Sequence, residues 1–106
     1  KLDYEGFFSP LVVERYAAYM HTKRQMADGS LRDSDNWQKG IPLTAYMKSM
    51  YRHFMDVWCH HRGWKQITLE PLEIALCGLL FNVQGYLHEV IKSRIAAAVN
   101  RDDPEF

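Results

Sequence analysis

A short polar loop carries the residue types that could bind a nucleotide. Between residues 33 and 40 it combines carboxylates, an amide, a large aromatic ring and a lysine, just ahead of a segment with helical spacing. The backbone N–H groups and the positive dipole at a helix N-terminus attract anions. Trp37 could stack on a base, and Lys39 could neutralise a phosphate. The same residues also fit a capped surface loop whose tryptophan closes one end of a helical bundle, and residue types alone leave both interpretations open.

A second group of polar side chains lies on the helix predicted after this loop. Arg52 and Asp56 are four residues apart and can form an ion pair along the helix. His53 lies within reach of Asp56 and could act as a general base that this carboxylate holds in place. The alternative is a partly buried histidine with a purely structural hydrogen bond. His53 and Asp56 are therefore the candidate catalytic residues.

The third polar group lies on the most apolar predicted helix. Asn82 interrupts it, and a buried amide that lacks partners costs about 1–3 kcal/mol. We expect Asn82 either to bond a neighbouring helix or water, or to face a ligand. Glu70 and Glu73 form an ExxE pair on the first turn, where acidic side chains also suit the helix dipole. They are the candidate metal ligands, although no second acidic pair follows them.

Three helices are needed to position these groups. Hydrophobic periodicity predicts them near residues 10–25, 43–62 and 70–98, the first opening with Ser9 as cap and Pro10 in the first turn. No segment alternates with period two, so we expect an all-α fold, an antiparallel helical bundle without a sheet. Seven large apolar residues at helical spacing are expected to form its core: Leu11, Met47, Phe54, Trp58, Leu76, Leu80 and Leu87.

Length and composition limit the class of protein. The 106 residues predict a single domain over residues 1–106. Because 13 Lys and Arg balance 13 Asp and Glu, we expect no nucleic acid as partner. The apolar run from Ile74 to Phe81 is too short to cross a bilayer, and the two cysteines lack CxxC spacing, so we expect a cytoplasmic protein without a membrane partner.

The third predicted helix also bears on the oligomeric state. It is too apolar over residues 74–87 for two partner helices to cover easily. Because an uncovered apolar stripe usually marks an interface, we expect a homodimer that completes the bundle.

In this order the motifs resemble a known protein family. Together they span roughly residues 6–92 and are similar to phage proteins of the dATP/dGTP diphosphohydrolase N-terminal domain family, all-α relatives of the MazG-like nucleotide pyrophosphatases. The matching stretches are Gly6–Leu11, Asp35–Pro42, Ser49-x-x-Arg52-His53, Ala75-Leu76-Cys77 and Phe81–Glu89.

The resemblance implies an enzyme of a bacterial host's cytoplasm that uses Mg²⁺ to cleave a purine deoxynucleoside triphosphate into monophosphate and pyrophosphate. The chain departs from the family at Ala75 and Gly78, where members carry histidines, and it lacks the ExxD motif of the MazG-like pattern. A non-catalytic phage or prophage protein that binds a protein partner is the alternative. The residues that match, and would bind or orient the nucleotide, are Asn36, Trp37, Lys39, Arg52, His53 and Asn82.

Overall fold

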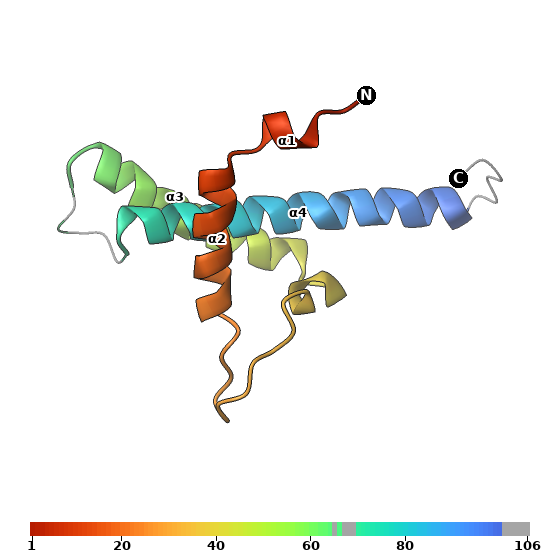
Figure 1. The fold of residues 1–106 in the computed structure, drawn as a ribbon, viewed down its shortest axis with the longest axis horizontal. Helices are drawn as coiled ribbons and strands as arrows, with labels where there is room; N and C mark the ends of the chain where they lie inside the picture. The colour runs from red at the N-terminus through yellow and green to blue at the C-terminus, as the bar shows by residue number, and fades with distance from the viewer. Residues whose placement is uncertain (65, 67–69, 101–106) are drawn as a thin grey trace. The chain divides into compact units, whose positions relative to one another are not determined.

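The helices follow the predicted order. A computed structural model describes residues 1–64, 66 and 70–100 of the chain, and within these ranges it contains no strand, only an isolated bridge between Gln25 and Leu31. The predicted all-α class is therefore confirmed. The elements, shown in Figure 1, are α1 (Tyr4–Phe7), α2 (Pro10–Thr22), the 3-10 helix η1 (Asn36–Lys39), α3 (Leu43–His61) and α4 (Leu72–Asn100).

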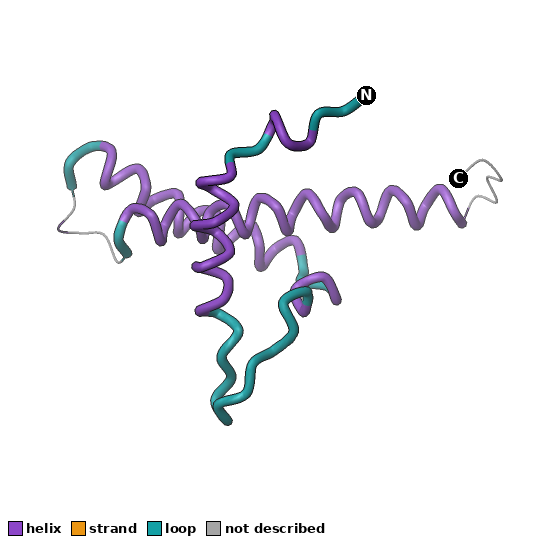
Figure 2. Tube along the Cα trace, viewed as in Figure 1, coloured by secondary structure: helices purple, strands orange, loops and turns teal. Residues whose placement is uncertain are grey.

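The chain divides into two compact units. The first covers Lys1–Asn36, with α1 and α2, and the second begins at Trp37 and contains α3 and α4; Figure 2 shows their helices and connecting loops. In the first unit the Ser9 side chain accepts a hydrogen bond from the Val12 N–H, and a proline occupies the first turn of α2, as the sequence predicts. A bundle of all three main helices stays a prediction.

In the second unit α3 and α4 form an antiparallel helical hairpin (Figure 1). A Cβ atom added to Gly78 would lie 2.6 Å from Cε1 of His53, and one added to Gly85 would collide with the ring of Tyr46. Tyr46 and His53 are seven residues apart, and so are the two glycines. Seven residues bring a helix back to nearly the same face. The ring of His53 therefore packs on Gly78 and the ring of Tyr46 on Gly85, along one line of contact between the helices.

The buried residues of the hairpin are polar or small for the most part. Glycine and alanine on α4 let the polar side of α3 pack closely against it. Most of the large apolar side chains of both helices therefore face solvent. The predicted core is therefore wrong: Leu11 in the first unit is 82% exposed, and the six predicted core residues of the hairpin are 38–56% exposed. The residues that are buried instead, which we name the hairpin seam, are Tyr46, His53, Asp56, Ala75, Cys77, Gly78, Asn82 and Gly85.

α4 is the one helix within the described ranges that is long and apolar enough to cross a bilayer by length and composition. The sequence predicts no membrane span here, since its uninterrupted apolar run is short. The core helices of soluble proteins have the same length and composition, so the cytoplasmic location stays a prediction.

Tyr46 is the largest fully buried side chain of the seam. Its ring packs against Phe81 with the ring centroids 5.9 Å apart. Its hydroxyl has no hydrogen-bond partner in the described part of the chain. Burial, together with the nearby Glu89 carboxylate, raises the pKa of Tyr46 above its ordinary value, so the folded state favours the neutral phenol.

Tyr46→Phe should raise the free energy of unfolding by about 1 kcal/mol at pH 7, because a buried polar group without a partner costs about 1–3 kcal/mol. The raised pKa adds a pH dependence. The neutral phenol's contribution is complete below the unfolded-state pKa of about 10, and is lost as pH rises through the folded-state pKa. The wild type should therefore lose more stability above about pH 10 than the variant. Urea denaturation at pH 7 and above about pH 10 measures the free energy of unfolding of both proteins. A Tyr46→Phe variant less stable than the wild type would show that the hydroxyl is hydrogen-bonded.

Candidate functional site

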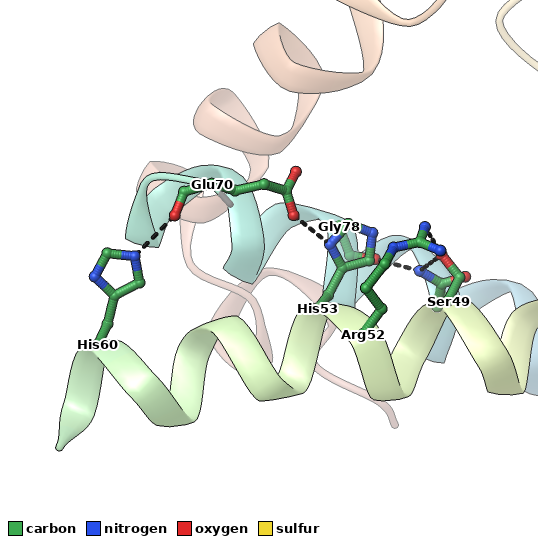
Figure 3. Close-up of polar contacts among 7 residues, drawn as sticks. Ser49, Arg52, His53, His60, Glu70 and Gly78 are labelled. Carbon is green, nitrogen blue, oxygen red and sulfur yellow. Dashed lines mark hydrogen bonds and ion pairs between the residues drawn. The ribbon is translucent and has the colours of Figure 1, made fainter. Parts of the chain in front are cut away.

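His53 and Glu70 form a close polar pair at the hairpin. His53 Nδ1 lies 2.7 Å from Glu70 Oε1 (Figure 3), and the two side chains are 10% and 25% exposed. Because an ionised carboxylate can only accept hydrogen bonds, Nδ1 carries the proton. In the neutral ring Nε2 is then an acceptor, and no other residue of the described chain bonds it. A histidine held in this way can take a proton from a water molecule or a substrate.

A second polar group meets this pair at Gly78. Asn82 Nδ2 donates to the Gly78 carbonyl at 2.7 Å and to Ser49 Oγ at 3.3 Å. Arg52 donates to the same Ser49 Oγ at 3.1 Å. Since the ring of His53 packs directly on Gly78, the network and the histidine occupy one point of the hairpin seam (Figure 3).

Glu70 is held by two histidines of α3. His60 Nε2 lies 2.8 Å from the backbone carbonyl of Glu70, while His53 bonds its side chain. The two histidines are seven residues apart, so both lie on the same face of α3. They therefore fix the chain just ahead of α4 and aim the Glu70 carboxylate at His53.

Asp56 is the predicted carboxylate partner of His53. It is buried one turn after His53 on α3, in the hairpin seam, as its spacing predicts. The carboxylate on His53 Nδ1, however, belongs to Glu70. The prediction of a carboxylate-held His53 therefore names the wrong acid for this contact, because the antiparallel return of the chain brings Glu70 onto the ring.

Glu70 and Glu73, the predicted metal ligands, lie just before and at the start of α4. Among the described residues no group of three or more His, Cys, Asp or Glu side chains could hold a metal ion. Glu70 Oε1 bonds His53, and Glu73 is exposed on the first turn of α4. Mg²⁺ at phosphate-processing sites is often held by one or two carboxylates and by substrate phosphates. A role of Glu70 and Glu73 as Mg²⁺ ligands therefore stays a prediction.

Trp37 lies on a different side of α4 from Asn82. Its ring makes edge contacts with His88 and Phe81, with centroid distances of 4.9 and 6.3 Å. Consecutive residues of an α-helix point about 100° apart, so Phe81 and Asn82 face different directions. These contacts agree with the structural interpretation of Trp37 as a residue that packs against the helices.

The remaining loop residues lie on η1. Asn36 opens η1, and its backbone N–H donates to the Asp33 carbonyl at 3.1 Å. Lys39 closes η1 and is exposed. Lys92 of α4 donates to the backbone carbonyl of Gln38 at 3.3 Å, which attaches η1 to α4. A single cleft that joins these residues to Arg52, His53 and Asn82 stays a prediction.

Four residues build this site and its hairpin without having been assigned a role from the sequence. Ser49 bridges Arg52 and Asn82, His60 anchors Glu70, and Gly78 and Gly85 make room for the rings of α3. The signal was present in the spacing. Seven residues separate Tyr46, His53 and His60 in turn, and seven separate the two glycines, as expected for two helices in continuous contact.

Comparisons with known proteins return no relative: no family model, no curated protein and no solved structure matches the chain. The class of protein is therefore defined by its fold and its candidate site. It is an all-α protein whose longest helices form a hairpin around a carboxylate–imidazole pair, with an arginine–serine–asparagine network beside it.

Proposed function

We propose that the α3–α4 hairpin binds a purine deoxynucleoside triphosphate, dATP or dGTP, and hydrolyses it to monophosphate and pyrophosphate in the cytoplasm of a bacterial host. One observation carries the proposal. Arg52, His53 and Asn82 are matched by the family resemblance, come from two helices, and meet at one point of the hairpin seam.

Arg52 supplies the positive charge for the phosphates. Its side chain is exposed, and its contact with Ser49 uses one of the two terminal nitrogens. A guanidinium has five N–H donors in a planar fork, so donors remain for phosphate oxygens. Asn82 holds Ser49 from the other helix, which fixes the position from which Arg52 reaches outward.

His53 acts as the general base. Its Nε2 takes a proton from a water molecule while the water oxygen attacks the α-phosphorus. The bond from the α-phosphorus to the oxygen that bridges to the β-phosphate breaks, and pyrophosphate leaves with the electron pair. Glu70 keeps Nδ1 protonated and stabilises the imidazolium that forms.

A panel of deoxynucleoside triphosphates with Mg²⁺, scored for pyrophosphate release, tests this function. We expect release from dATP or dGTP and a KM about 10–100-fold higher in Arg52→Ala, since a hydrogen bond to a charged group contributes about 1.5–3 kcal/mol. Arg62→Ala, which removes an exposed guanidinium more than two turns away, should leave KM unchanged. If the wild type neither binds nor cleaves any nucleotide, the proposal is wrong.

The second candidate is a protein that binds a protein partner without catalysis. The exposed apolar sides of α3 and α4 favour it, because soluble proteins seldom leave contiguous apolar patches uncovered. This second candidate predicts that the protein neither binds nor cleaves any nucleotide of the panel. The two candidates are compatible if the covering partner lies on the side away from the hairpin seam.

A further inference from the structure

The outer side of α4 carries an apolar stripe with heptad spacing. Two series run along it, each repeating every seven residues and offset from the other by three or four. Such interleaved series form the contact face of a helix that packs along another helix. The stripe lies opposite Gly78 and Gly85, where α3 packs. Its members, which we name the α4 stripe, are 38–56% exposed: Leu76, Leu80, Val83, Leu87 and Val90.

No other helix of the described chain is long enough to cover the whole face from Glu73 to Arg94. From Glu73 to Arg94 the face is about 32 Å long at 1.5 Å per residue. α3 packs over the two glycines on the other side of α4. α2 has 13 residues and is about 20 Å long. Neither helix therefore spans the whole face, which has the length for a helix of a second chain.

The two ends of the stripe carry opposite charges. Glu73 lies one heptad before Leu80, and Arg94 lies one heptad after Leu87, and both are exposed. Two parallel copies of α4 would bring like charges together. Two antiparallel copies place Glu73 of each chain near the partner's Arg94. The dipoles of the two helices are then also antiparallel, which is the favourable arrangement.

We propose that the α4 stripe is a two-fold dimer interface in which the α4 helices of two copies of this chain pack antiparallel. The α4 stripe is self-complementary under a two-fold axis near its centre, as an isologous interface requires. Exposed polar residues lie at its edge and at its two ends, namely Gln84, Glu73 and Arg94. An apolar face with a polar rim suits a protein partner better than lipid chains. The stripe lies on the other side of α4 from the hairpin seam, and the dimer does not depend on the proposed function.

Sedimentation equilibrium of the full chain over a dilution series measures the dimer. Leu87→Glu should raise the dimer Kd at least ~100-fold, because the substitution falls on both chains and buries a charge at the centre of the contact. Ile95→Glu is the matched control, an exposed apolar residue of α4 outside the stripe, and should keep the wild-type Kd. Circular dichroism establishes that both variants are folded.

Charge reversal tests the orientation. Glu73→Arg and Arg94→Glu should each raise the dimer Kd, and the double variant should restore it toward the wild-type value. A wild type that is monomeric at every concentration, or that associates only with lipid vesicles, overturns the proposal. So does a Leu87→Glu variant with the wild-type Kd, or a double variant weaker than both single ones. Failure of nucleotide hydrolysis in a normal dimer would reject the proposed function alone.

Discussion

Replacing His53 with alanine should lower the kcat of pyrophosphate release by about 10²–10⁴-fold, the range that a positioned general base contributes. KM should change little, because in the proposed mechanism the imidazole acts on the attacking water and Arg52 holds the phosphates. His61→Ala is the matched control, since this histidine is exposed at the end of α3. It should keep the wild-type kcat.

Glu70→Gln separates the role of the carboxylate from that of the ring. The amide keeps the shape of the side chain but removes the charge that stabilises the imidazolium, so kcat should fall about 10-fold or more while KM is retained. His53 is nine-tenths buried, so denaturation curves must first show that both variants fold. If folded His53→Ala retains wild-type turnover while Arg52→Ala does not, another residue is the base.

The sequence predicts where the helices lie better than it predicts which side of each helix is buried. Periodicity identified α3 and α4 within a few residues, because apolar residues recur with the helical period. The same periodicity placed Leu76, Leu80 and Leu87 in the core, yet they are exposed. Hydropathy alone marks a side that needs a partner, and it does not say whether that partner lies in the same chain.

The size of the residues on the opposite side decides the packing. Gly78 and Gly85 let two rings of α3 lie directly on the α4 backbone. Gly78 also stands where members of the resembled family carry histidine, and here the ring of His53 fills that space. Gly78 and Gly85 are spaced by seven on α4, as Tyr46 and His53 are on α3. This matched spacing of small and large residues indicates the sides on which the two helices pack.

The sequence predicts which residues belong to the candidate site better than it predicts which of them contact each other. The sequence selects Arg52, His53 and Asn82, and the structure brings them close together, while their role stays a prediction. Glu70 is a predicted metal ligand, which stays untested, and it bonds His53, a contact that the sequence does not predict. Spacing along one helix suggested Asp56 as the acid, whereas the contact at 2.7 Å depends on how the chain returns at the end of α3. Such long-range pairing is set by the hairpin and leaves no local pattern.

Gly85→Ala should lower the free energy of unfolding by about 1–3 kcal/mol, the usual cost of overpacking a close-packed interior. At an exposed helical position the same change would stabilise by up to about 1 kcal/mol, because alanine has the higher helix propensity. The sign reverses here because the added methyl group collides with the ring of Tyr46, a side chain only 1% exposed. The ring has no space to move away, so the two helices must separate.

A double-mutant cycle isolates this collision. Tyr46→Leu alone should destabilise the hairpin by leaving a cavity. In its background, Gly85→Ala should cost less than in the wild type, giving a coupling of about 0.5–3 kcal/mol that favours the double variant. Urea denaturation of the four proteins measures the cycle. Additive effects, or a Gly85→Ala single variant more stable than the wild type, would show that Tyr46 does not pack on α4 as the structure places it.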